Sequence, residues 1–179
     1  MIRKARQSDL PQMALLITKN IGTCDVLPTD TRGGVKEEII FSRNLKHCTA
    51  NLNKYFVYEK DGKVVGICGI SNIKSKKNSY GVNLPKYKEV LYLVTDKDQQ
   101  RQGIGSALLN FCTKNHSYPI VYEAWGEKQT NSKVLLEKLG FELIKDLGRD
   151  YYKNLNYCPT CSCSHKNCNS CAAELWILY

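Results

Sequence analysis

Residues that could bind an anion stand in the middle of the chain, between a short apolar run and an amphipathic run. They are Gln100, Gly103 and Gly105, with Arg101 and Ser106 beside the glycines. A helix that begins here leaves backbone N–H groups unpaired at the positive end of its dipole. Glycine lets the main chain come close to a bound group. The stretch therefore predicts an anion site made mostly of backbone, of the kind that holds a phosphate.

A second set of reactive side chains lies near the end of the chain, where cysteines are concentrated. Each CxxC pair turns the chain so that both sulfurs face one point, and two pairs complete a tetrahedral site. We predict one structural zinc held by four thiolates, those of Cys158, Cys161, Cys168 and Cys171. Cys163 and His165 lie between the pairs and are reserve ligands.

Two other readings of this cysteine segment stay open. An iron–sulfur cluster would use the same four thiolates. Disulfides fit poorly, because the chain has no secretion signal. The remaining cysteines are dispersed, and we expect reduced, mostly buried thiols at Cys24, Cys48, Cys68 and Cys112.

A strand and a helix must position the glycine turn. Residues 90–94 form an apolar, β-branched run that predicts a strand. The helix is predicted from apolar residues that share one face, namely Ile104, Ala107, Leu108, Phe111 and Cys112.

The rest of the chain supplies alternating strands and helices. The clearest local signal is a hairpin over 55–70, because Asp61-Gly62 between two β-rich runs favours a type I′ turn. We expect further strands at 2–6, 119–125, 141–144, 150–153 and 174–179. Helices are expected from Ser8 to Ile17, over about 35–45, and from the cap Asn131 to Leu139, with Gly140 ending the last one.

Gln100-x-x-Gly103-x-Gly105, after a strand and opening a helix, resembles the pyrophosphate-binding motif of the GNAT superfamily of acyl-CoA N-acyltransferases. Asn131 followed by Leu139-Gly140-Phe141 is similar to a second feature of that family. The order of elements also resembles the family over nearly the whole chain except the cysteine segment.

The resemblance implies an α/β (α+β) fold with a mixed, mostly antiparallel central sheet, a splayed central strand pair and flanking helices. We expect one domain over 1–179. The cysteine-rich segment, 157–172, would then be an insertion between the last two strands, a small loop held by metal.

The resemblance also implies an acetyl-CoA-dependent N-acetyltransferase that moves an acetyl group to a primary amine by direct transfer in a ternary complex. Backbone N–H groups from Arg101 to Ser106 would hold the pyrophosphate, and the end of the central strand would lie along the pantetheine arm. The expected coenzyme-binding residues are Leu93, Val94, Thr95, Gln100, Arg101, Gln102, Gly103, Ile104, Gly105, Ser106 and Asn131.

A protonated amine must lose a proton before it can attack a thioester. Glu89, which begins the central strand, and Glu123, on the next strand, are the candidate bases. Either could instead be a glutamate at a strand end in solvent, and an amine that is already neutral needs no base.

One position departs from the family. Many members place a tyrosine four residues before the glycine that ends the last helix, as a proton donor to the thiolate; here that residue is Leu136. A water or one of several tyrosines could replace it, namely Tyr92, Tyr122, Tyr151 or Tyr152. The gap keeps two alternatives open: a non-catalytic acyl-CoA-binding sensor, and a zinc-knuckle module that binds a partner on a degenerate transferase scaffold.

Charge and hydropathy set the remaining expectations. The formal charge is +9, and Lys74, Lys76 and Lys77 cluster, but no nucleic-acid motif accompanies them. We therefore expect a lysine-rich soluble surface rather than a nucleic-acid partner. No apolar run approaches the ~18 residues of a membrane span, so we expect a cytoplasmic protein with no membrane contact. The amine acceptor is left unspecified, and a homodimer is left open.

Overall fold

The structure, a computed structural model, describes residues 1–21, 37–74, 80–114, 116–125, 130–148, 151 and 172–179. One seven-stranded sheet runs through these residues, in the order β1-β2-β3-β4-β5-β7-β6. Its strands are β1 (Ile2–Lys4), β2 (Tyr55–Lys60), β3 (Lys63–Ile70), β4 (Lys88–Thr95), β5 (Ile120–Trp125), β6 (Glu142–Gly148) and β7 (Ala173–Leu178). Neighbouring strands are antiparallel except β4 and β5, which are parallel. The predicted mixed, mostly antiparallel sheet is confirmed.

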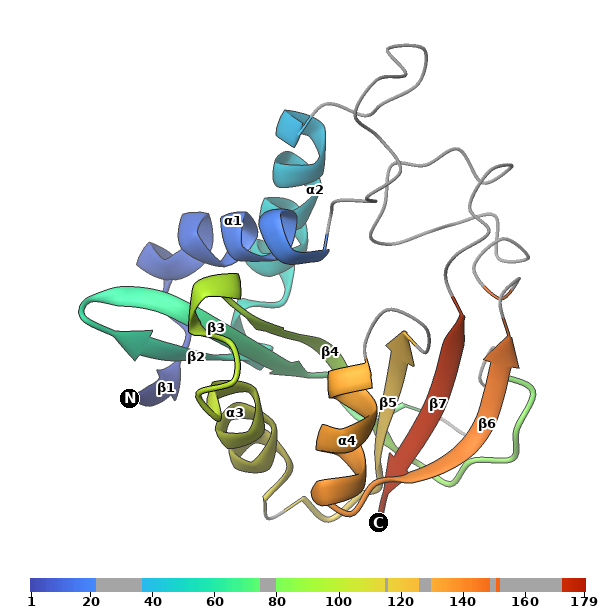
Figure 1. The fold of residues 1–179 in the computed structure, drawn as a ribbon. Helices are drawn as coiled ribbons and strands as arrows, with labels where there is room; N and C mark the ends of the chain where they lie inside the picture. The colour runs from blue at the N-terminus through green and yellow to red at the C-terminus, as the bar shows by residue number, and fades with distance from the viewer. Residues whose placement is uncertain (22–36, 75–79, 115, 126–129, 149–150, 152–171) are drawn as a thin grey trace, which may run out of the picture.

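Helices cover both faces of the sheet, as Figure 1 shows, with α1 and α2 on one face and α3 and α4 on the other. They are α1 (Leu10–Ile21), α2 (Glu37–Ala50), α3 (Ile104–Thr113) and α4 (Thr130–Lys138). Short 3-10 helices precede α1, β2 and α3, namely η1 (Gln7–Asp9), η2 (Leu52–Lys54) and η3 (Lys97–Gln99). Among the described residues, no helix is both long and apolar enough to cross a membrane.

The predicted hairpin is present as β2 and β3. Its two turn residues, Asp61 and Gly62, have φ angles of +51° and +71°. Both values lie in the left-handed region that a type I′ turn requires, and Asp and Gly reach this region more easily than other residues. Local sequence was sufficient here because the turn chemistry and the flanking β-rich runs agree.

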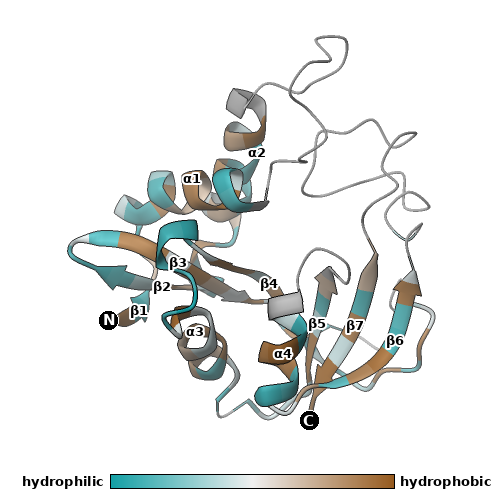
Figure 2. Cartoon of the chain, viewed as in Figure 1, coloured by the Kyte–Doolittle hydropathy of each residue, from teal (hydrophilic) through white to brown (hydrophobic). Residues whose placement is uncertain are grey.

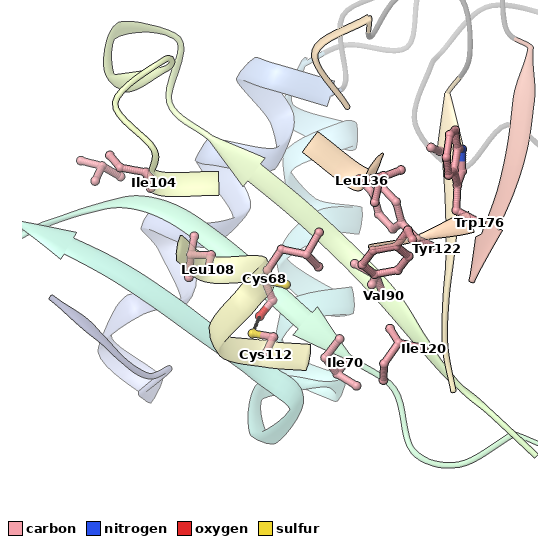
Figure 3. Close-up of a cluster of buried hydrophobic side chains, with 14 residues drawn as sticks. Cys68, Ile70, Val90, Ile104, Leu108, Cys112, Ile120, Tyr122, Leu136 and Trp176 are labelled. Carbon is pink, nitrogen blue, oxygen red and sulfur yellow. Dashed lines mark hydrogen bonds between the residues drawn. The ribbon is translucent and has the colours of Figure 1, made fainter. Parts of the chain in front are cut away.

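Alternating side chains of the strands build a core on each face. Figure 2 shows the long hydrophobic stretches of the central strands, such as KVVGICGI in β3. On the α1–α2 face, Met13 and Ile17 pack against Val57 and Ile67. On the α3–α4 face, Leu108 packs with residues that Figure 3 displays, among them Cys68, Val90, Tyr122, Leu136 and Trp176.

A third apolar cluster lies on the C-terminal half of the sheet, on the face opposite α4. Val121 of β5 and Leu175 and Ile177 of β7 form its floor. Tyr80, Leu84 and Tyr87 cover them from the connection between β3 and β4. The second half of this long connection therefore belongs to the core.

Several predicted boundaries were wrong; α1, for example, was expected to end at Ile17 but continues to Ile21. Helix α2 was expected to end near residue 45 but continues to Ala50, where buried Cys48 joins the α1–α2 core. Strand β6 extends to Gly148 because it pairs with β7 along that length. Helix α4 begins at Thr130, so Asn131 lies in its first turn rather than before it. The strand expected at 150–153 lies mostly outside the described residues.

Strands β4 and β5 separate soon after they begin. Their parallel pairing consists of Lys88 with Ile120 and Glu89 with Val121. On its other side, β4 carries a bulge where the register with β3 shifts between Cys68 and Ile70. A bulge leaves an extra residue outside the ladder and increases the local twist. The predicted splay of the central strand pair is therefore present.

Candidate functional site

The turn between β4 and α3 is built by short-range contacts. The Asp96 carboxylate accepts the backbone N–H of Asp98 at 3.1 Å, and the Gln100 side-chain amide donates to the Thr95 carbonyl at 3.4 Å. Arg101 and Gly103 have φ angles of +61° and +78°, and Gly103 is the N-cap of α3. Positive φ suits glycine but is uncommon for arginine. The turn therefore folds back over the end of β4 and exposes the first backbone amides of α3.

A cavity of about 490 Å³ lies between this turn, the end of β4 and α4. It brings together nine of the eleven predicted coenzyme-binding residues: Leu93, Val94, Thr95, Gln100, Arg101, Gly103, Ile104, Gly105 and Ser106. Residues so close in sequence reach one wall because the strand, the turn and the helix start meet at a single edge of the sheet.

The other two predicted residues are Gln102, which is not among the described lining residues, and Asn131. The Gln102 side chain lies toward the β2–β3 hairpin, where its Oε1 accepts Lys60 Nζ at 3.1 Å. Asn131 lies in α4, and its side chain is outside the described part of the structure. Its neighbour Ser132 does line the cavity.

Sequence reasoning missed four lining residues: Asn20, Gln99, Ser132 and Leu135. Gln99 and Ser132 adjoin predicted positions, so a wider window around each motif would have included them. Asn20 comes from the last turn of α1, far away in the sequence. No local pattern marks Asn20, because only the packing of α1 on the sheet brings it to the cavity.

The cavity suits a negatively charged group. Among the described lining residues, Arg101 is charged and none is acidic. The α3 N-terminus adds unpaired backbone N–H groups and the positive end of a ten-residue helix dipole. A Cβ built on Gly105 would lie 3.4 Å from Thr95 Oγ1, so a side chain there would occupy space at the cavity wall.

The walls of the cavity continue along β4. Leu93, Val94 and Thr95 lie beyond the two residues at which β4 pairs with β5. From this point, the edge of β4 that faces β5 has no strand partner among the described residues. An unpaired edge offers backbone donors and acceptors to an extended, amide-containing molecule.

The two predicted bases lie together on the opposite side of the sheet from α4. Glu89 pairs with Val121 across the strands, and Glu123 is two residues further, so all three side chains share one face. Neither glutamate lines the cavity. The Glu89 carboxylate accepts from the Lys74 ammonium and the Tyr80 hydroxyl, while Glu123 Oε2 accepts the Tyr151 hydroxyl at 3.3 Å. Glu89 is thus not a solvent-exposed strand end.

The candidate replacements for the missing tyrosine are spread over both faces. Leu136 is fully buried, and Figure 3 shows it in the same core cluster as Tyr122. Burial raises the pKa of Tyr122 above its ordinary value. Tyr92 contacts His47 edge-on, with ring centroids 5.1 Å apart, and Tyr151 stacks on Tyr80. Tyr152 lies outside the described residues.

The structure gives no geometry for the predicted metal site. The predicted ligands belong to the connection between β6 and β7 and lie within 152–171, outside the described residues. They are Cys158, Cys161, Cys168 and Cys171, with Cys163 and His165 in reserve. In the part of the chain that is described, no three His, Cys, Asp or Glu side chains are grouped to hold a metal. Cys48, Cys68 and Cys112 are free and buried there, as predicted, and burial raises the pKa of Cys48 to about 12.

The described residues thus form a split, mostly antiparallel α/β sheet with a cavity at the start of a helix, and the described lining of that cavity has no acidic side chain. Residues 51–143 match the family model described as an acetyltransferase (GNAT) domain, which is 93 of the 179 residues. The chain therefore belongs to the GNAT acetyltransferase family. A search of curated protein sequences finds no match.

Solved structures share the fold along nearly their full length. An N-acetyltransferase from Staphylococcus aureus Mu50 has a TM-score of 0.65 at 16% identity, with 99% of this chain and 100% of that chain covered. A ribosomal-protein-alanine N-acetyltransferase from Brucella melitensis has a TM-score of 0.64 at 16% identity, covering 99% and 98%. A Mycobacterium tuberculosis protein in complex with CoA and NLQ has a TM-score of 0.60 at 16% identity, covering 100% and 99%.

Proposed function

We propose that this protein is an acetyl-CoA-dependent N-acetyltransferase that moves an acetyl group to a primary amine by direct transfer in a ternary complex. The observation that carries the proposal is the cavity at the start of α3, which continues along β4; among the described residues, its lining has no acidic side chain and this edge of β4 has no strand partner. Membership of the GNAT acetyltransferase family supports acetyl transfer. The Mycobacterium tuberculosis protein solved with CoA supports the choice of coenzyme.

Each part of acetyl-CoA has a matching part of the site. The backbone N–H groups from Arg101 to Ser106 would bind the pyrophosphate, with charge from Arg101. The amides of the pantetheine arm would pair with the edge of β4 at Leu93, Val94 and Thr95. This arrangement directs the thioester into the split between β4 and β5, toward the face that carries Glu89 and Glu123.

The acceptor nitrogen loses two protons in the proposed reaction. An ammonium acceptor gives one proton to a carboxylate, and the neutral nitrogen attacks the thioester carbon. The C–N bond forms and the C–S bond breaks, and the second proton lost by nitrogen goes to the departing thiolate. The products are the amide, CoA thiol and one proton released through the base. Glu89 and Glu123 are the proposed bases. Glu89 accepts a hydrogen bond from the Tyr80 hydroxyl, and Glu123 accepts one from the Tyr151 hydroxyl.

Calorimetric titration with acetyl-CoA tests the coenzyme site. We expect saturable binding to the native protein and at least a tenfold weaker affinity for Gly105→Trp, because the indole would fill the space beside Thr95. Ala107→Trp is the matched control, since Ala107 is exposed on the same helix and does not line the cavity. No binding to folded native protein, or equal loss in both variants, would contradict the proposed site.

A second candidate function is an acyl-CoA sensor without turnover. The observation that favours it is Leu136, which is fully buried and offers no proton to a leaving thiolate. Thiol release from acetyl-CoA, measured with a panel of primary amines, separates the two functions. Release that depends on an amine supports the transferase, whereas tight binding with no release from any amine supports the sensor.

We also propose that the cysteine segment holds one structural zinc. The support is its donor set, since two CxxC pairs match the spacing and the thiolate chemistry of closed zinc sites. Four thiolates leave no open coordination position, so the metal would hold the β6–β7 connection rather than take part in transfer. The partner-binding alternative rests on these same residues, outside the described part of the chain.

A further inference from the structure

The connection between β3 and β4 returns to the beginning of β4 and is fixed there by backbone contacts. Ser71 N–H donates to the Glu89 carbonyl at 2.8 Å, and Glu89 N–H donates to Ser71 Oγ at 2.9 Å. Lys74 and Tyr87 form an antiparallel bridge, with N–O distances of 2.6 and 3.3 Å. These contacts hold the Lys74 side chain beside Glu89.

Both oxygens of the Glu89 carboxylate have a donor from this connection. Oε2 accepts from Lys74 Nζ, and Oε1 accepts the Tyr80 hydroxyl at 2.5 Å. The Glu89 side chain is 13% exposed, whereas that of Lys74 is 45% exposed. Charge-assisted hydrogen bonds of this kind are stronger than neutral ones and fix the orientation of the acceptor.

Tyr80 is itself held through its ring and through its backbone carbonyl. Its ring stacks on Tyr151 at a centroid distance of 6.4 Å, and Lys145 Nζ donates to its carbonyl at 2.8 Å. The residue is 6% exposed. Burial, then the charges of Glu89 and Glu123, raise the pKa of Tyr80, so it stays a protonated donor at neutral pH.

The contacts continue to the second glutamate. The Tyr151 hydroxyl donates to Glu123 Oε2 at 3.3 Å, so stacked tyrosines lie between the two carboxylates. Among the described residues, the charged and titratable groups that face Glu89 are Lys74, Tyr80 and Tyr87 from the connection, with Glu123 from β5 beyond the tyrosines. Of these groups, Lys74 and Tyr80 touch its carboxylate.

We propose, resting on the proposed transferase function, that Lys74 and Tyr80 are positioning residues that hold the Glu89 carboxylate in one orientation for proton transfer from the acceptor amine. The two contacts come from different residues and reach different oxygens, so together they fix how the carboxylate is turned. Glu89 takes one proton from the ammonium and returns it to solvent after transfer. The β3–β4 connection thereby becomes part of the acceptor side of the site.

The experiment measures amine-dependent thiol release, from pH 6 to pH 10, in Tyr80→Phe, Lys74→Met and Glu89→Gln. We expect the first two variants to lower kcat about tenfold at pH 7, because each removes a hydrogen bond that orients the carboxylate. The KM for acetyl-CoA should stay within twofold, because neither residue lines the cavity. In the double variant of Tyr80→Phe and Glu89→Gln, kcat should be no lower than in Glu89→Gln alone.

Matched controls separate positioning from folding. Lys86→Met removes an exposed lysine of the same connection, and Tyr58→Phe removes a hydroxyl on β2; both should leave the profile unchanged. If Tyr80→Phe and Lys74→Met lower only the melting temperature and leave kcat unchanged, the contacts are structural and the proposal is wrong. If the native protein binds acetyl-CoA but no amine in the panel causes thiol release, the proposed function is wrong. The positioning role is then wrong as well.

Discussion

Asp9 is a carboxylate that ties the first strand to the first helix. Arg3 Nη1 and Nη2 donate to its two oxygens at 2.7 and 2.9 Å, and the Arg6 N–H donates to Oδ2 at 2.7 Å. The Arg3 hydrogen bonds are the main cause that lowers the pKa of Asp9 below its ordinary value, and burial opposes them. The Asp9 residue is 4% exposed, so water would not replace hydrogen bonds that are lost with its charge.

We expect Asp9→Asn to lower the free energy of unfolding by about 2 kcal/mol at pH 7, because hydrogen bonds to a charged group are lost. The folded pKa of Asp9 is depressed, so its contribution is present above the unfolded pKa near 4 and is lost as pH falls below it. Urea denaturation at pH 7 and pH 3 checks this. The gap between variant and native protein should shrink at pH 3, and Asp61→Asn, in the exposed hairpin turn, should show no such gap.

At the scale of elements, α3 is seated on β3 through a glycine. A Cβ on Gly66 would lie 2.9 Å from both Ile104 Cγ2 and Leu108 Cδ1. These contacts let α3 approach the sheet closely, and Ile104 is also the first residue of that helix. The position of the turn between β4 and α3 therefore depends on a glycine in another element.

Gly66→Ala should reduce stability by about 1–3 kcal/mol and weaken acetyl-CoA binding, because the added methyl group pushes the start of α3 outward. Gly62→Ala is the comparison: nothing lies within 4 Å of its Cβ, and its positive φ alone costs about 1 kcal/mol. Urea denaturation with calorimetry distinguishes them. Unchanged affinity in Gly66→Ala would mean that the turn keeps its place independently of this packing.

At the scale of the whole molecule, the cavity and the cysteine segment belong to different parts of the chain. The described lining residues come from α1, β4, the following turn, α3 and α4, whereas the cysteines connect β6 to β7. A metal in that connection would hold two strands at the edge of the sheet farthest from β1. Removal of the metal should therefore lower the stability of the protein without changing its affinity for the coenzyme.

We expect purified protein to be colourless and to contain one zinc per chain, by elemental analysis. Removal by a chelator should lower the melting temperature by several degrees, since structural zinc contributes to folding. The affinity for acetyl-CoA should stay within about twofold. A brown, iron-containing protein, or a metal-free chain of unchanged stability, would rule out the structural zinc site.

Sequence alone determined the features that short stretches of chain specify. The Asp61-Gly62 turn, the strand before Gln100 and the helix after Gly103 each follow from turn chemistry and the period of apolar residues. Nine of the predicted coenzyme-binding residues meet at one cavity for the same reason, because they belong to one continuous strand–turn–helix unit.

Tertiary structure alone decided what depends on contacts between distant residues. Sequence marked Glu89 as a candidate base but could not reveal Lys74 and Tyr80 as its partners, since neither forms a motif with it. Asn20 reaches the cavity only because α1 packs on the sheet, and β7 lies between β5 and β6 only through its pairing with both. Local patterns encode each element, whereas the side chains that meet across elements are chosen by how those elements pack together.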